Sequence, residues 1–219
     1  NGDANPAHII YECLHNATWG LGYAASEIDA TSFQTAANTL ASEQYGLSLL
    51  WEREQPLEEF IAEILRHIDG TLYVHPRTGK FVLKLARADY NVSSLLVLDA
   101  SNILELESFS RPSESELVNQ ITVRYRDRST DKEAAITVHD LAALELAGGV
   151  VSSATVDYPG IGNGSLASRV ALGDLKQLSV PLAKATLIAN RQASNLNIGD
   201  VFKFTWTELG IAQLVMRVV

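Results

Sequence analysis

The sequence predicts an α+β protein: an N-terminal α/β domain with helices packed on a small mixed sheet, followed by a mostly antiparallel, β-barrel-like domain. The first half contains three segments with apolar residues at helical spacing, and the second half is rich in short alternating segments separated by turns. Residues 1–111 hold 7 Lys and Arg against 15 Asp and Glu, whereas residues 112–219 hold 10 against 11, which together make the totals of 17 and 26. We therefore expect two domains, residues 1–111 and 112–219.

Three helices are expected in the first domain. The first opens at Asn5-Pro6, where Asn can cap the free amides and Pro at the first helical position loses no hydrogen bond. The second spans Thr31 or Ser32 to Tyr45 and stops at Gly46. The third begins at Pro56 and continues to Ile68, with a continuous apolar stripe that should face a sheet.

Short strands and a linker complete the first domain. Residues 47–51 form an apolar run typical of a strand, and residues 71–75 and 80–85 predict a hairpin closed by a Pro- and Gly-containing turn. A further apolar run covers residues 95–98. The polar, proline-containing segment 110–115 marks the expected domain boundary.

The second domain is expected to be mostly β. Residues 120–126 alternate strictly between apolar and polar, which predicts a half-solvated antiparallel strand that turns back into residues 134–138. A short helix is expected at 140–147, ended by two glycines, and a longer one from Ser165 to about Leu178. The remaining predicted strands are residues 150–158, 182–189, 201–206 and 212–219.

The composition excludes several classes of protein. The chain has 219 residues, 47% of them apolar, so it can build a core without disulfide or metal support. Cys13 is the only cysteine, and no segment approaches the roughly 18 consecutive apolar residues of a membrane helix. The net charge of −9 argues against nucleic-acid specificity. The polar N-terminus lacks a secretory signal, and the apolar end at 214–219 suggests a fragment of a longer protein.

No pattern of catalytic or metal-binding residues is recognisable. Cys13 lies on an apolar helical stripe without a basic neighbour, so we expect it to pack. The histidines lack the i, i+4 spacing and glutamate partner of a helical zinc site. We expect surface or packing roles for all five: His8, His15, His67, His75 and His139. The sequence thus predicts no catalytic residue, no metal site and no cofactor.

One glycine-rich segment has some features of a phosphate-binding site. Gly160–Ser165 precedes a helix, and exposed amides at a helix start can bind anions. The segment lacks the Lys-Ser/Thr ending of a P-loop and the glycine spacing of a dinucleotide fingerprint. We therefore expect a flexible connecting loop.

The carboxylates and tryptophans are candidates for a glycosidase pair and for a sugar-binding platform. Glu58 and Glu59 point to different faces of a helix, which favours surface charges over a glycosidase pair. The sequence leaves open whether Asp89, Asp99 and Asp157 lie close together in the folded protein. Core packing is favoured over a sugar platform for the tryptophans, because each sits in an apolar run: Trp19, Trp51 and Trp206.

Ten segments spread over most of the chain form a recognisable pattern. They are residues 5–14 (NPAHIIYECL), 19–22 (WGLG), Ile28-Asp29, Ser32-Phe33, Ala36-Ala37, 68–73, 79–83, 116–125, 199–202 and Gly210-Ile211. In these segments the chain resembles the family of tail-tip attachment and baseplate-hub proteins of long-tailed phages, prophages and gene transfer agents. The resemblance implies a homotrimer at the distal end of the tail tube, in contact with other tail proteins, in a virion made in the host cytoplasm. Residues 1–111 would be the inserted α/β domain of the hub and 112–219 its second barrel.

A structural subunit of the tail tip or hub, without enzymatic activity, is therefore the leading hypothesis. A near-neutral, strand-rich second half suits the head-to-tail contacts of a ring. Two alternatives from other classes stay open. The chain could be a tail-associated cell-wall or polysaccharide hydrolase, or a receptor- or carbohydrate-binding module that uses exposed tryptophans.

Overall fold

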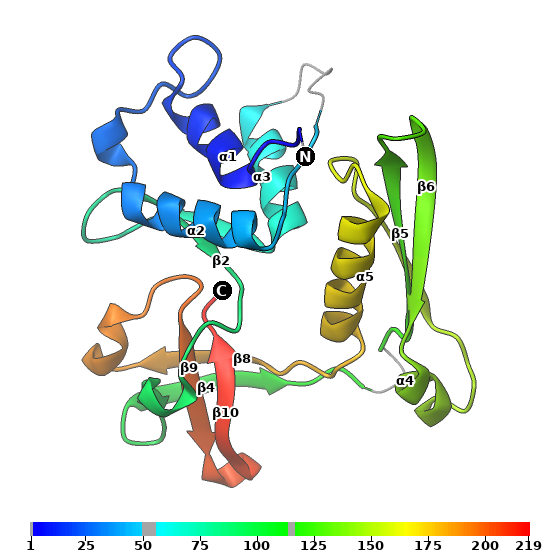
Figure 1. The fold of residues 1–219 in the computed structure, drawn as a ribbon. Helices are drawn as coiled ribbons and strands as arrows, with labels where there is room; N and C mark the ends of the chain where they lie inside the picture. Colours follow the sequence, from blue (N-terminus) through cyan, green and yellow to red (C-terminus); the bar gives the residue numbers. More distant parts are fainter. Residues whose placement is uncertain (1, 50–55, 114–116) are drawn as a thin grey trace.

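The structure, a computed structural model, describes residues 2–49, 56–113 and 117–219. Its elements form three groups: helices and a hairpin from the first 90 residues, a sheet covered by one long helix, and a set of short strands that includes the C-terminus (Figure 1). Helices and strands are thus mixed without regular alternation, which confirms the α+β class.

The N-terminal group has its three helices where they were predicted. It contains α1 (Pro6–His15), η1 (Ala25–Glu27), α2 (Ala30–Ser42), α3 (Leu57–Ile68), β1 (Gly70–Val74) and β2 (Phe81–Leu85). The strands form an antiparallel hairpin. The small mixed sheet expected here is reduced to this hairpin, because the described residues of the group add only two isolated bridges, a parallel one between Ile28 and Phe81 and an antiparallel one between Ala4 and Leu47.

Local capping explains where the helices begin. The Asn5 side chain accepts a hydrogen bond from the Ala7 amide at 3.0 Å and donates one to the Ala37 carbonyl at 2.9 Å, so it caps α1 and ties it to α2. Asp29 caps α2 through the Ser32 amide. These two side chains therefore set both the helix starts and the first contact between helices.

The end of α2 differs from the prediction. The helix stops at Ser42, and Gln44 takes the left-handed conformation with φ 52° in place of the expected stop at Gly46. Tyr45 then turns inward and is only 9% exposed. The expected strand at 47–51 is reduced to a bridge between Leu47 and Ala4, and residues 50 and 51 lie outside the described residues.

The second group is a three-stranded sheet with a helix on one face. It contains β5 (Gln120–Asp127), β6 (Lys132–His139), α4 (Leu141–Leu146), β7 (Ser153–Asp157) and α5 (Gly164–Leu178). The central strand β5 pairs antiparallel with β6 and parallel with β7. The predicted alternation holds, since Ile121, Val123 and Tyr125 are buried. The intervening α4 is what allows β7 to return parallel to β5.

The third group consists of two small sheets. It contains η2 (Val92–Ser94), β3 (Val97–Leu98), β4 (Ile103–Ser110), β8 (Lys184–Ala189), η4 (Arg191–Asn195), β9 (Val201–Trp206), η5 (Thr207–Leu209) and β10 (Ile211–Arg217). The strand orders are β10-β9-β3 and β4-β8. In the described chain these sheets do not close into a barrel.

Hydrogen bonding crosses the boundary expected between residues 111 and 112. Strand β4 pairs antiparallel with β8, and β3 pairs parallel with β9. Their apolar side chains pack around Phe204 in one cluster. Residues 117–180 are therefore an excursion that leaves the third group after β4 and returns to it at β8.

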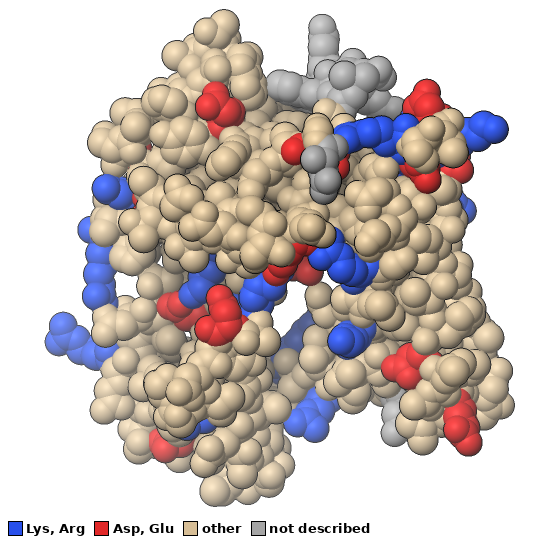
Figure 2. All heavy atoms as spheres, viewed as in Figure 1, with Lys and Arg blue, Asp and Glu red and all other residues tan. Residues whose placement is uncertain are grey.

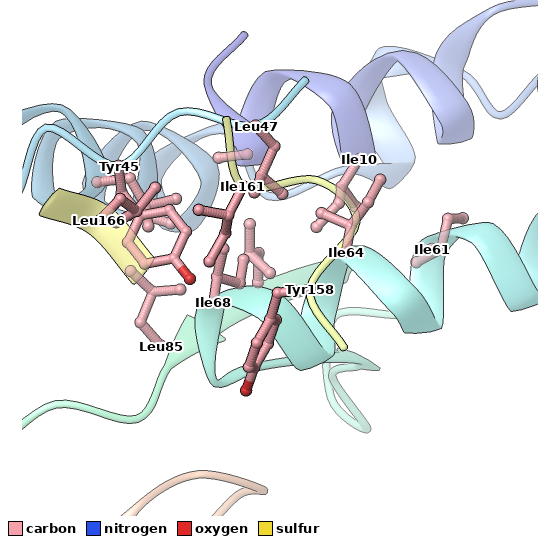
Figure 3. Close-up of a cluster of buried hydrophobic side chains, with 14 of the residues drawn as sticks. Ile10, Tyr45, Leu47, Ile61, Ile64, Ile68, Leu85, Tyr158, Ile161 and Leu166 are labelled. Carbon is pink, nitrogen blue, oxygen red and sulfur yellow. The ribbon is translucent and has the colours of Figure 1, made fainter. Parts of the chain in front are cut away.

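A larger apolar cluster joins the first and second groups. The N-terminal group contributes Ile10, Leu47 and Ile64 to it (Figure 3). The second group contributes Ile161, from the segment before α5, and Leu166, from the first turn of α5. The third group joins the N-terminal group through polar contacts, among them the Lys84–Asp200 ion pair, in a region where Figure 2 shows charges of both signs gathered.

Truncations inside the larger cluster should destabilise both groups that share it. Ile64 and Ile161 are each 0% exposed, so we expect Ile64→Ala and Ile161→Ala each to lower the free energy of unfolding by about 2–5 kcal/mol. Urea titration followed by circular dichroism should show the main transition move in both variants. Leu104→Ala is the control, because Leu104 is 72% exposed and its loss should cost less than about 0.5 kcal/mol. Two separate transitions, each sensitive to one variant, would contradict a shared core.

Candidate functional site

The clearest concentration of polar side chains lies where α3 meets α5. A crevice of about 380 Å³ opens there. Its polar lining residues are Glu43, Tyr45, His67, Asp69, Arg87, Arg169, Asp174 and Gln177. Because these groups come from the first two groups of elements, the crevice marks the joint between them.

His67 is the buried centre of this joint. The residue is 2% exposed, its Nδ1 lies 2.7 Å from the Glu63 carbonyl oxygen, and its Nε2 lies 3.2 Å from the Gly160 amide nitrogen. A carbonyl only accepts and an amide only donates, so the ring is neutral with its proton on Nδ1. Burial lowers the pKa of His67, in keeping with the neutral form. The imidazole thus connects α3 to the segment before α5.

The segment that receives this bond is packed against the core. A Cβ on Gly160 would lie 2.9 Å from Leu49 Cγ and 3.2 Å from His67 Nε2, so only glycine fits there. Ile161 is fully buried, and Asn163 caps α5 through the Leu166 amide at 2.9 Å. Residues 160–163 connect β7 to α5 as expected, but this connection is packed against the core, and Gly164 and Ser165 already belong to α5.

The carboxylates of the crevice are engaged by neighbouring side chains. Asp174 accepts from the Tyr158 hydroxyl at 2.8 Å, and Glu43 accepts two bonds from Arg87 at 2.7 and 2.8 Å. Asp69 interacts with Gln177. Desolvation in the crevice raises the pKa of both Asp69 and Asp174. This arrangement is suited to holding α3 and α5 together.

The three aspartates considered as a possible cluster lie at the ends of different elements. Asp89 follows β2, and Asp157 is the last residue of β7. Asp99 lies in the turn before β4, where its carboxylate accepts a hydrogen bond from the Ser101 hydroxyl. In the described part of the chain, no three His, Cys, Asp or Glu side chains are placed to hold a metal ion. Glu58 and Glu59 are exposed in the first turn of α3, as expected.

Burial confirms the expected roles of the histidines and of Cys13. His67 packs in the core, His75 is half-buried, and the other three histidines are exposed. Cys13 is fully buried, and burial raises its pKa to about 11, so the thiol stays protonated at neutral pH.

Trp19 departs from the expected core packing. It is 47% exposed in a turn that folds back on α1, where the Asn16 side chain accepts from the Thr18 amide at 2.9 Å. Gly20 is required in this turn, because a Cβ there would lie 2.6 Å from the Cys13 carbonyl. Trp206 is half-buried and stacks on Phe204, whereas Trp51 lies outside the described residues.

A second feature is an exposed apolar face around α4. None of its residues is buried, and exposed aliphatic side chains continue into the segment before β7, at Val150 and Val151, and recur after α5, at Val180 and Leu182. Such a face is typical of a contact surface between proteins. The described residues include no helix of the length and apolar character needed to cross a membrane.

The neutral state of His67 gives a pH-dependent prediction. Because its folded pKa lies below the ordinary 6.5, its contribution to stability is present above about pH 6.5 and is lost as the pH falls, by at most about 1.4 kcal/mol per pH unit. Asp69 and Asp174 act in the opposite direction, since their folded pKa values are raised. Glu63 beside the ring stays ionised in this range: burial alone would raise its pKa, but Arg66 and His67 lower it.

His67→Gln separates these effects, because glutamine keeps an acceptor for the Gly160 amide but does not titrate. Chemical unfolding at pH 7.5, 6.5, 5.5 and 5.0 should show a larger loss of stability in the natural protein than in the variant. Parallel curves for the two proteins would contradict a neutral His67 at the joint.

Comparison with known proteins identifies the family. The family described as "Putative phage tail protein" matches residues 57–219. The solved tail protein from Neisseria meningitidis MC58 is 14% identical with a TM-score of 0.53, and the match covers 78% of this chain and 52% of that one. Prophage tail protein gp18 from Listeria monocytogenes EGD-e is 16% identical with a TM-score of 0.40, covering 74% and 46%.

The first of these likenesses concerns the fold alone, and the matches span only about half the length of the two solved chains. No significant match is found among curated proteins. The family match covers well over half of the sequence, from α3 to the C-terminus. The chain belongs to this phage tail protein family.

Proposed function

We propose that the protein is a structural subunit of the tail tip or baseplate hub, assembled at the distal end of the tail tube. The family match over residues 57–219 carries this proposal. The resemblance of residues 5–14 and 19–22 to tail-tip proteins adds the finer position in the tail. In this role the protein acts by contacts with copies of itself and with other tail proteins, and not by catalysis.

The surface supports such a role. Strands β4 and β8 form a two-stranded sheet, so each has an edge without a partner strand in the described chain. Edge strands and exposed apolar faces are the features through which subunits join. The proposed assembly is a trimer, in which one face of each subunit meets a different face of the next.

The position in the virion is directly measurable. Antibodies against this chain, applied to purified particles and viewed by immunogold electron microscopy, should label the distal end of the tail. Light scattering on the full-length protein should give the mass of three copies. Label along the tube or on the head would overturn the tip assignment, and clearing of host cell walls in a zymogram would favour the hydrolase alternative.

A second candidate function rests on Trp19. Its exposed ring is held in a turn fixed by the Asn16 side chain and by Gly20, which is how a preformed stacking surface for a sugar would be presented. A receptor- or carbohydrate-binding role would use this ring.

A glycan array with the purified protein tests the binding role. We expect any specific glycan binding to be lost in Trp19→Ala while the circular dichroism spectrum is unchanged. Tyr90→Ala is the matched control, because Tyr90 is also exposed, at 36%, in a different part of the chain. Equal binding by the natural protein and Trp19→Ala would exclude this role for Trp19.

A further inference from the structure

The helix α4 is an apolar element without a core of its own. Leu141 is 73% exposed, Leu146 89% and Val150 66%. A helix of 6 residues is far shorter than the length at which helices are stable alone in water, about 12–15 residues. Its exposed leucines belong to neither apolar cluster, and they cost solubility unless another surface covers them.

The surrounding chain holds α4 firmly in this exposed position. Asn119 is 4% exposed, its carbonyl accepts from the Asp140 amide at 2.9 Å, and its Nδ2 donates to the Val150 carbonyl at 2.8 Å. Its Oδ1 accepts from the Ser152 amide at 2.9 Å. One buried residue thus ties down both ends of the α4 segment, the start through its backbone carbonyl and the end through its side chain, so α4 is fixed where it stands.

A groove of matching character lies beyond the end of α5. It has a volume of about 580 Å³, within the roughly 300–1,000 Å³ of pockets that enclose ligands. Its apolar lining residues are Leu117, Leu178, Val180 and Leu182. Leu182 is 54% exposed and Val180 50%, so these side chains are also uncovered.

The charges of the two surfaces are opposite. Residues 139–152, which carry α4, contain Asp140 and Glu145 and no Lys or Arg. Asp140 is used within the chain, since it caps α4 through the Ala143 amide at 3.0 Å. Glu145 is exposed beside the leucines. The charged residues among those that line the groove are Arg111 and Lys184, both exposed.

We propose that α4 of one copy docks in the groove of a second copy of this chain, with Leu146 on the apolar floor and Glu145 facing Arg111 and Lys184. Apolar burial supplies the affinity, and the charge pairing selects the orientation. In the proposed ring this contact repeats head-to-tail, with α4 of each copy in the groove of the next. This inference names the self-contact that the proposed structural role leaves open, and it rests on that role.

Site-specific cross-linking tests the pairing directly. Leu146→Cys is placed in one chain and Leu182→Cys in a second chain carrying a tag of different mass, and the two are mixed with a flexible bis-maleimide. The natural Cys13 is 0% exposed and stays out of the reaction. We expect a mixed-mass product that is at least tenfold more abundant than the product from Leu146→Cys with Val74→Cys, whose position is 51% exposed on β1.

Equal yields from the two mixtures would show random collision and overturn the proposal. So would exclusive intrachain linkage in a single chain carrying both substitutions, because α4 would then reach its own groove. The absence of any mixed product would overturn it as well.

Charge exchange provides an independent readout. In sedimentation velocity, Glu145→Lys should weaken self-association at least tenfold, and mixing it with an Arg111→Glu/Lys184→Glu chain should restore association. Glu12→Lys is the matched control, because Glu12 is exposed on α1, in the first group of elements, and belongs to neither α4 nor the groove. Failure of the exchange to restore association would refute the pairing, whereas the immunogold result would still decide the tail position by itself.

Discussion

The hydrogen bond from the Gly160 amide to His67 Nε2 fixes the joint on which the arrangement of the molecule depends. It links residues 93 positions apart and places Ile161 in the cluster built by α1, α2 and α3. A buried amide left without an acceptor costs about 1–3 kcal/mol, so the imidazole specifies the position of the segment as well as filling space. From this anchor α5 begins, and α5 in turn covers β5 and β6.

The third group of elements is attached by different means. Its apolar cluster around Phe204 is separate from the larger one. Arg217 donates to the Gly199 carbonyl at 2.7 Å and to the Arg87 carbonyl at 2.8 Å, and Lys84 pairs with Asp200. Partly exposed contacts of this kind contribute less than apolar burial. The β4–β8 pairing joins the two strands from which residues 117–180 leave and to which they return, so it holds together the two ends of this excursion.

The satisfied polar groups and the uncovered apolar side chains of the second group lie in different places. The polar groups at the α3–α5 joint satisfy one another, as His67, Tyr158 and Asp174 illustrate. Several of the apolar side chains left uncovered lie in the second group around α4 and in the groove beyond the end of α5. The structural role proposed for this phage tail protein calls for such a distribution, with polar groups that organise the interior and apolar patches that can contact other subunits.

Local chemistry determined much of the fold from the sequence alone. The Asn5 cap, the apolar stripe of α3 and the alternation of β5 follow from periodicity and hydrogen-bonding needs within a few residues, and each lies where it was predicted. Strand β4 was not predicted, although residues 104–107 alternate between leucine and glutamate, because its partner β8 is about 80 positions away in the chain. The burial of His67, the anchoring of Gly160 and the exposure of Trp19 were likewise decided by tertiary contacts, because side chains distant in sequence set the environment of each.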